Sequence, residues 1–308
     1  MAEAHGWWPP LLWKGQLRSL FPEPSFFGLV SVLVVPFLFY SIIKFKKNFF
    51  FSCIYSLCLL MLFLTKARTS LVLFILQSLL FYIFIFLKSQ YGRKALTVFL
   101  ISIFSFLISV YLIAGFKGSS NYEKTTDNSS MTKEILEYVD NNIAAVVGNK
   151  RSNNARFANI RATFLVGVKH PLFGVGRGMS DAYVSDNFTE EDMQDNEVRH
   201  NWIYYMREKG VLKSSIPILN QFTIEIAQFG VPGLLMYIFP VVFILKKMYQ
   251  KLKYNLDLEI ACVSIAYIGS VVALFPNRAF LTYYILTVTM ILLLCNEKEE
   301  GAVRNEFD

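Results

Sequence analysis

The stretch Thr69–Leu87 reads TSLVLFILQSLLFYIFIFL and contains no charged residue. An apolar run of about 18 to 20 residues is long enough, as a helix, to cross a hydrocarbon core of ~30 Å. Six other apolar runs recur along the chain, at Ser25–Ile43, Phe49–Thr65, Ala95–Ala114, Phe222–Leu245, Ile260–Phe275 and Phe280–Cys295. The pattern therefore predicts an all-α, polytopic helical membrane protein of about seven spans.

The composition agrees with this class. Of the 308 residues, 54% are hydrophobic and 17% are charged, whereas a soluble domain is about 45–50% apolar and about 25% charged. Met1–Lys14 has no basic start followed by an apolar core, so we expect no cleavable signal peptide. All four cysteines fall in the apolar runs without the spacing of metal ligands, and we expect neither a metal nor another cofactor.

The positive charges are placed as in a membrane protein. Phe116–Gln221 holds 13 basic and 13 acidic residues, although the whole chain has a net charge of +7. The short loops at Lys44–Lys47, Lys88–Lys94 and Lys246–Lys253 hold 10 basic residues and no acidic one. Cytoplasmic loops of membrane proteins have this bias, and a nucleic-acid-binding patch does not.

Placing the three basic loops in the cytoplasm makes every span alternate. The N-terminus and Phe116–Gln221 then lie outside the cytoplasmic (inner) membrane, and the acidic tail Glu297–Asp308 lies inside. We therefore predict a four-span bundle in residues 1–115, an extracytoplasmic helical loop domain in residues 116–221, and a three-span bundle with a cytoplasmic tail in residues 222–308.

Some basic residues lie at outer ends of the spans, where such residues are depleted. They are Arg18, Lys66, Arg68 and Arg278. For Lys66 we favour contact with lipid headgroups along a snorkelling side chain. For Arg68 and Arg278 the alternatives are snorkelling and binding of the phosphate of an outer-leaflet lipid substrate.

The predicted outer loop contains two helical patterns. In Thr132–Val147 apolar residues recur at helical spacing, which indicates an amphipathic surface helix. A second helix opens at Asn153, and Arg156 and Arg161, five residues apart, lie on different faces of it. It ends at His170-Pro171.

The segment after this helix is rich in glycine. Gly174, Gly176 and Gly178 alternate, which suits either a tight chain reversal or a loop whose N–H groups approach a ligand. The acidic run Glu190–Glu197 is typical of a solvated face, and its spacing is not that of a calcium loop. His200 follows this run and is either a surface residue or a catalytic one.

Several motifs together resemble the O-antigen polymerase and ligase superfamily. The resemblance covers about Arg18 to Leu245 and rests on short motifs in a shared order. They are Arg18–Phe27, Thr65-Lys66-Ala67-Arg68-Thr69-Ser70, Arg156, His170-Pro171-Leu172-Phe173-Gly174-Val175-Gly176, His200-Asn201 and Glu225–Leu235.

The resemblance implies a membrane-embedded glycosyltransferase. Such enzymes take a glycan linked through diphosphate to a polyprenol such as undecaprenol, and transfer it to a sugar hydroxyl outside the cytoplasmic membrane. They use neither a nucleotide sugar nor a metal. Polymerases join repeat units into capsule, exopolysaccharide or O-antigen chains, and ligases transfer a finished chain to another acceptor. The expected partners are the lipid-linked oligosaccharide, the bilayer and other polysaccharide-assembly proteins.

The resemblance also suggests roles for single residues. Arg68 and Arg156 match arginine positions of the family, whereas Arg161 and Arg278 are candidates by location only. Guanidinium groups suit a diphosphate leaving group, which gains negative charge as the anomeric bond breaks. His200 is the candidate catalytic base for the acceptor hydroxyl.

The sequence departs from the family pattern in two places. In the family, His-Asn leads directly into the span that carries Glu225, but here Lys209–Ile218 intervenes and Leu219-Asn220 stands at the usual spacing. Either His200 is the motif histidine and an insertion follows, or Asn220 is the retained asparagine, which suits a polymerase. Asn220 is therefore a candidate residue for binding the diphosphate or the glycan. Family members also carry more spans before the Arg18 segment, so the alternatives are that the chain is the C-terminal part of a larger protein, the product of a second start, or the product of a remnant gene.

We therefore predict polymerisation of polyprenyl-diphosphate-linked repeat units. The enzymatic alternative is an O-antigen-type ligase. The non-enzymatic alternative is a non-catalytic fragment or a transport or scaffold subunit. A transporter is disfavoured because the spans hold almost no charged residue except Glu225, near an outer helix end.

Overall fold

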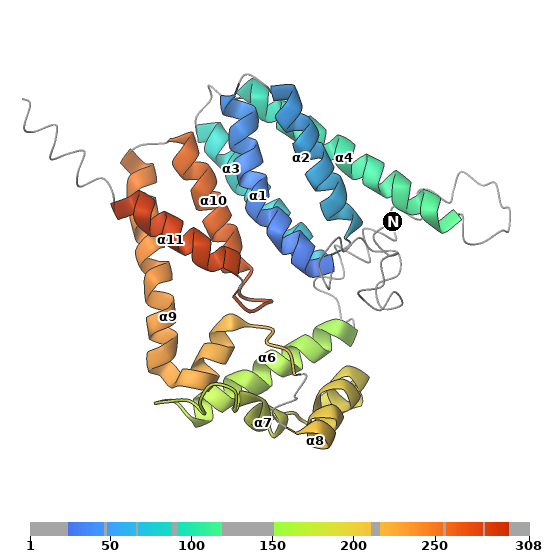
Figure 1. The fold of residues 1–308 in the computed structure, drawn as a ribbon, viewed down its shortest axis with the longest axis vertical. Coiled ribbons are helices and arrows are strands. Elements are labelled where there is room, and N and C mark those ends of the chain that lie inside the picture. The colour runs from blue at the N-terminus through green and yellow to red at the C-terminus, as the bar shows by residue number, and fades with distance from the viewer. Residues whose placement is uncertain are drawn as a thin grey trace, which may run out of the picture. The chain divides into compact units, whose positions relative to one another are not determined.

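The computed structural model describes residues 24–45, 48–65, 67–87, 92–118, 151–210, 216–254, 257–279 and 281–295. Within these ranges all regular secondary structure is helical, which confirms the all-α class. The described residues divide into two compact units (Figure 1). Unit 1 comprises α1 to α4 and the part of the chain from Gln250 to Ser270, and unit 2 comprises the part from α6 to Tyr249 and the part from Val271 onward.

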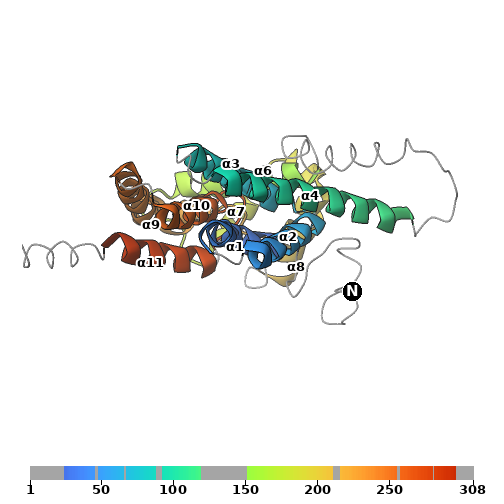
Figure 2. The same cartoon turned by 90° about the horizontal axis from the view of Figure 1, so that it is seen from above.

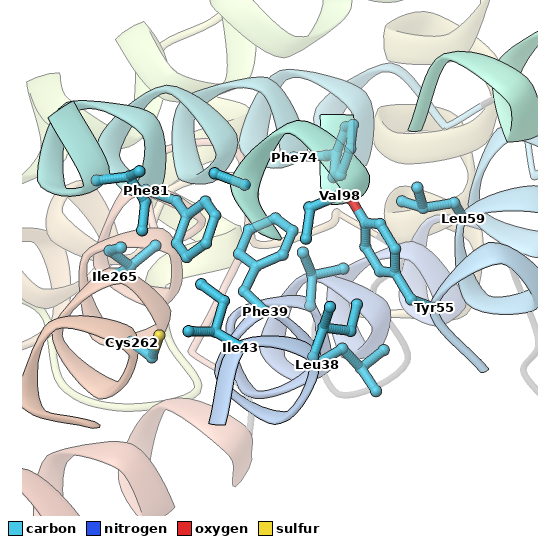
Figure 3. Packing of buried hydrophobic residues seen from close by; sticks show 14 of the residues in the cluster. Leu38, Phe39, Ile43, Tyr55, Leu59, Phe74, Phe81, Val98, Cys262 and Ile265 are labelled. Carbon is cyan, nitrogen blue, oxygen red and sulfur yellow. The ribbon is translucent and has the colours of Figure 1, made fainter. Parts of the chain in front are cut away.

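Unit 1 is a bundle of long apolar helices. They are α1 (Pro24–Lys44), α2 (Asn48–Leu64), α3 (Arg68–Leu87), α4 (Gly92–Gly118) and most of α10 (Leu258–Val272). Helix α1 packs against α2 and α3, and α2 packs against α4, as Figures 1 and 2 both show. In the core the ring of Phe39 stacks on Phe81 with centroids 4.3 Å apart and meets Tyr55 edge-on at 5.4 Å (Figure 3).

Polar side chains also join the helices of unit 1. The Tyr55 hydroxyl and Ser102 Oγ are 2.8 Å apart, and Ser56 Oγ and Ser105 Oγ are 2.9 Å apart, so two hydrogen bonds link α2 to α4. Hydrogen bonds of this kind between hydroxyl side chains are a usual means of holding helices together in an apolar environment, where water cannot serve as the partner.

Unit 2 combines short helices with one long helix. Its elements are α6 (Arg151–Lys169), α7 (Ser180–Ser185), a 3₁₀ turn η3 (Asp192–Gln194), a π-helical segment η4 (Glu197–Tyr204), α8 (Tyr205–Lys209), α9 (Gln221–Tyr254) and α11 (Leu281–Cys295). Of α9, the part up to Tyr249 belongs to unit 2. Buried side chains from α6, η4 and α9 form its core, among them Ala162, Val166, Trp202 and Ala227.

The predicted spans coincide with helices. Each of the seven apolar runs overlaps one of α1, α2, α3, α4, α9, α10 and α11. Two stretches in the described part, Thr69–Leu87 and Gln221–Lys253, are long and apolar enough to cross a membrane by length and composition, and the other apolar helices are shorter. The number of seven spans and the outer position of the loop therefore stay predictions.

The predicted helix at Asn153 is confirmed by α6, which ends at Lys169, immediately before His170-Pro171. The predicted helix Thr132–Val147 lies outside the described residues, as do Arg18, Lys66 and the acidic tail.

Candidate functional site

Helix α9 is interrupted at Gly230, whose backbone has φ 70° and ψ −167° (Figure 1). In a continuous helix the carbonyls of Ala227 and Gln228 would accept hydrogen bonds from residues 231 and 232. Pro232 has no N–H, and the Val231 N–H is directed elsewhere. The break therefore leaves two carbonyl groups of α9 without partners inside the helix.

The loop 170–176 supplies those partners. Its N–H groups at Val175 and Gly176 donate to the carbonyls of Ala227 and Gln228, at 2.9 and 3.0 Å, and the Val231 N–H donates to the Pro171 carbonyl at 2.7 Å. We call these three hydrogen bonds the backbone lock. It joins two of the motifs on which the family resemblance rests.

Two glycines allow the chains to approach so closely. A Cβ atom at Gly174 (φ 64°) would lie 2.3 Å from the carbonyl carbon of Gln228. A Cβ atom at Gly230 would lie 2.6 Å from the carbonyl carbon of Leu172. Because the N–H groups of Val175 and Gly176 are used by α9, these two groups are not free to bind an anion. The glycine pattern thus serves a chain reversal that is locked onto α9.

The lock is followed by an arginine that sequence reasoning missed. Arg177 is exposed and stands between Gly176 and Gly178, both with φ 86°. It lies within electrostatic range of the Glu225 carboxylate in the second turn of α9. The sequence signal for Arg177 was its position directly after the glycine motif. An exposed residue in a turn shows no periodic pattern by which it could have been identified.

Asn220 caps the start of α9. Its Oδ1 accepts a hydrogen bond from the Thr223 N–H at 3.0 Å, and the residue is 9% exposed. An asparagine in this position satisfies one of the N–H groups that a helix leaves unpaired in its first turn. Sequence reasoning considered Asn220 only as a candidate substrate-binding residue, and the structure gives it this local role as well.

Gln221 ties α9 to the turn between α10 and α11. Its N–H donates to the Leu274 carbonyl at 2.9 Å, and its Oε1 accepts from the Ala279 N–H at 2.7 Å. Its Nε2 donates to Glu225 Oε1 at 2.6 Å. One side chain therefore fixes both the turn and the carboxylate.

Two of the predicted arginines belong to this same region. Arg156 Nη1 on α6 donates to the Pro276 carbonyl in the α10–α11 turn at 3.5 Å. Arg278 lies in the same turn, is exposed, and has no hydrogen-bond or ion-pair partner in the part of the chain that the structure describes. We refer to Arg156, Arg177, Glu225 and Arg278 as the α9-start cluster.

Arg161 faces another way, as its spacing from Arg156 predicts. Its Nη2 forms an ion pair with Asp192 Oδ2 and lies 3.3 Å from Thr189 Oγ1. Asp192 Oδ2 also accepts from the Thr189 N–H at 2.6 Å. Arg161 thus links α6 to the turn that contains the acidic run.

His200 lies on the exposed side of η4, whose other side is buried through Val198 and Trp202. Its Nε2 is 3.2 Å from Nε and 3.0 Å from Nη2 of Arg199. An arginine can only donate, so Nε2 is the acceptor in this arrangement. Arg68, the last predicted residue, is the first residue of α3 in unit 1.

The capping role of Asn220 can be measured. We expect Asn220→Ala to lower the stability of unit 2 by about 1 kcal/mol, and Asn220→Asp to retain most of it, because both side chains cap well and alanine does not. Thermal unfolding of the purified protein in detergent tests this. Equal stability of the alanine variant and the unchanged chain would contradict the capping role.

A comparison with known families agrees with this arrangement. Residues 53–238, more than half of the chain, match the family model described as O-antigen ligase. No curated protein and no solved structure matches the chain. The matched range includes α3, the backbone lock, the first part of α9 with its interruption at Gly230, and most of the α9-start cluster. The molecule is thus an integral membrane protein of the glycosyltransferase-like class.

The chain belongs to the O-antigen ligase family. Enzymes of this kind act on lipid-linked oligosaccharides in the membrane, either as ligases or as polymerases.

Proposed function

We propose that the protein polymerises polyprenyl-diphosphate-linked oligosaccharide repeat units into a capsular, extracellular or O-antigen polysaccharide. The observation that carries the proposal is the α9-start cluster. Gln221, the first residue of α9, hydrogen-bonds both Glu225 and the α10–α11 turn, which contains Arg278 and accepts a hydrogen bond from Arg156. Arg177 lies within electrostatic range of Glu225. The cluster lies in the predicted extracytoplasmic loop and the helix ends next to it, on the side where lipid-linked glycans are polymerised.

The reaction needs positive charge at the leaving group. An acceptor hydroxyl oxygen bonds to the anomeric carbon of the donor glycan, and the bond from that carbon to the diphosphate oxygen breaks. The electron pair leaves with the polyprenyl diphosphate. Arg156 and Arg278 are the residues we assign to the diphosphate, because guanidinium groups bind phosphate oxygens through two parallel hydrogen bonds. Arg68 matches a family arginine and is a further candidate.

The acceptor hydroxyl must lose its proton in the same step. Glu225 supplies the carboxylate of the cluster, and the hydrogen bond from Gln221 Nε2 fixes the position of its Oε1. We assign Glu225 as the proton acceptor in the polymerase, since a positioned carboxylate can take a proton from a reacting hydroxyl.

The alternative is an O-antigen-type ligase, in which His200 would act as the base. A general base needs a free lone pair, and the Nε2 lone pair of His200 faces the guanidinium of Arg199. This contact supports the other alignment, in which Asn220 holds the family position and His200 is not required.

His200→Ala distinguishes the two alternatives. We expect the variant to retain polymer formation within a few-fold of the unchanged chain, because the polymerase uses Glu225. If His200 were the base, the rate would fall by about 10²–10⁴. Polymer made per cell, divided by the protein level on a blot, is the measurement.

The experiment that tests the function is complementation of a strain deleted for the corresponding locus, with polysaccharide length read on a gel. We expect the chain to restore polymer. A protein that inserts into the membrane at normal levels and restores none would favour the non-catalytic alternative. Transfer of preformed polymer to another acceptor, without lengthening, would favour the ligase.

A further inference from the structure

A cavity of about 780 Å³ lies in unit 2, between α6 and the acidic turn. Its volume falls within the range of about 300–1,000 Å³ that is usual for ligand pockets. It is distinct from the α9-start cluster, since none of Arg156, Arg177, Glu225 and Arg278 lines it. The residues that matter most for its chemistry are Asn154, Phe157, Arg161, Glu191, Gln194 and Asn196.

The lining combines one exposed aromatic ring with planar polar groups. Phe157 is 70% exposed although it belongs to a helix with a well-buried opposite face. Residues with amide, carboxylate and guanidinium groups line the same cavity. Each of these can hydrogen-bond two neighbouring hydroxyl groups at once, and an aromatic ring can cover the apolar C–H face of a sugar ring.

Several of the polar groups have unused hydrogen-bonding capacity. Within the described ranges, the side chains of Asn154, Glu191 and Gln194 have no hydrogen-bond partner. Arg161 uses its Nη2 for Asp192 and Thr189, and its Nε and Nη1 groups make no other hydrogen bond in the described part. Donors and acceptors are thus both present for a ligand with many hydroxyl groups.

The charge of the lining restricts which sugars fit. Arg161 is paired with Asp192, so its charge is offset, and the carboxylate of Glu191, which has no partner in the described part of the chain, leaves the cavity net negative. A net negative lining repels phosphate and uronate groups at close range. A neutral or amino sugar meets no such repulsion.

We propose that this cavity binds a neutral or amino-sugar segment of the oligosaccharide, apart from the reacting diphosphate. The inference rests on the proposed polymerase function, and it gives Arg161 a role toward glycan rather than toward diphosphate. The segment belongs either to the donor repeat unit or to the growing chain, which share this chemistry.

Binding to the full chain in lipid nanodiscs tests the proposal. The probes are oligosaccharides released by mild acid from the producing strain's own polysaccharide, with oligogalacturonate as an anionic comparison. We expect at least one released fragment to bind and oligogalacturonate not to bind. Absence of binding by every fragment, or equal binding of oligogalacturonate, would overturn the proposal.

Matched variants locate the site. Phe157→Ala should weaken fragment binding about tenfold or more, because it removes the ring on which the sugar packs. Phe164→Ala is the control, since Phe164 is an exposed phenylalanine two turns along α6 that does not line the cavity. Gln194→Ala should also weaken binding, and it removes no apolar surface from α6. If both cavity variants bind like the unchanged chain, the cavity is not the glycan site.

Polymer length separates the two sources of the glycan. If the cavity holds the growing chain, Phe157→Ala shortens the polymer, and if it holds the donor repeat, the amount falls without shortening. Failure of the proposed polymerase function gives a different result. The unchanged chain would then make no polymer even though it binds fragments.

Discussion

Gly230→Ala is expected to disrupt unit 2 severely, although it adds only one methyl group. The backbone at Gly230 has φ 70° and ψ −167°, a region that is open essentially only to glycine. Adopting it costs a non-glycine residue about 1–3 kcal/mol. The added Cβ would also lie 2.6 Å from backbone atoms of Pro171 and Leu172, which cannot move as a side chain can.

The lock must therefore open in this variant. Opening it leaves the carbonyls of Ala227 and Gln228 without their partners in the loop, and each unsatisfied buried group costs about 1–3 kcal/mol. Together these costs amount to several kcal/mol, a large fraction of the stability of an ordinary domain. Loss of polymer formation should follow, because the lock positions Arg177 and the first turns of α9.

Hydrogen exchange followed by mass spectrometry measures this directly. We expect the amides of Val175, Gly176 and Val231 to exchange much faster in Gly230→Ala. Gly178→Ala is the control, since Gly178 also has a positive φ of 86° but, in the described part of the chain, no atom lies within 4 Å of the added Cβ. Gly178→Ala should show only the destabilisation that a positive φ causes for an alanine. Similar exchange in both variants would show that the close approach at Gly230 is unimportant.

Arg156→Ala is expected to lower the polymerisation rate by about 10²–10³. Removal of one preorganised donor to a developing anion has an effect of this size. Arg156 is half-buried on α6 and also donates to the Pro276 carbonyl, so the variant tests both charge and position. Arg156→Lys keeps the positive charge but loses the planar guanidinium group. Its polymerisation rate should lie between those of the unchanged chain and of Arg156→Ala.

Arg207→Ala is the matched control for this series. Arg207 is an exposed arginine in the last turn of α8, outside the α9-start cluster. Its replacement should leave the rate unchanged. Melting temperatures of all variants separate a loss of substrate contact from a loss of fold. Equal rates for the Arg156 and Arg207 variants, with both proteins folded, would remove Arg156 from the diphosphate site.

Much of the fold could be predicted because it follows from local patterns. The uninterrupted apolar run Thr69–Leu87 predicts α3, and the asparagines at 153 and 154 predict a helix there, although α6 begins slightly earlier, at Arg151. The spacing of Arg156 and Arg161 correctly places them on different faces, with Pro276 as partner of one and Asp192 as partner of the other.

The site was harder to predict because its contacts are between distant parts of the chain. In the backbone lock, main-chain groups pair with main-chain groups, so the only traces in the sequence are Gly174, Gly230 and Pro232. These residues are compatible with many turns. Arg177 lies after such a turn and has no periodic pattern. Asn220 could have been identified as a cap, since asparagine before an apolar helix is a known start signal.

The central claim is tested most directly with purified protein in nanodiscs and a polyprenyl-diphosphate-linked repeat unit as the sole substrate. Product length on a gel and release of polyprenyl diphosphate are followed together. We predict products longer by whole repeat units, with one polyprenyl diphosphate released for each bond formed and without any nucleotide sugar. Folded protein that binds the substrate but neither lengthens the glycan nor releases the diphosphate would contradict the proposed polymerase.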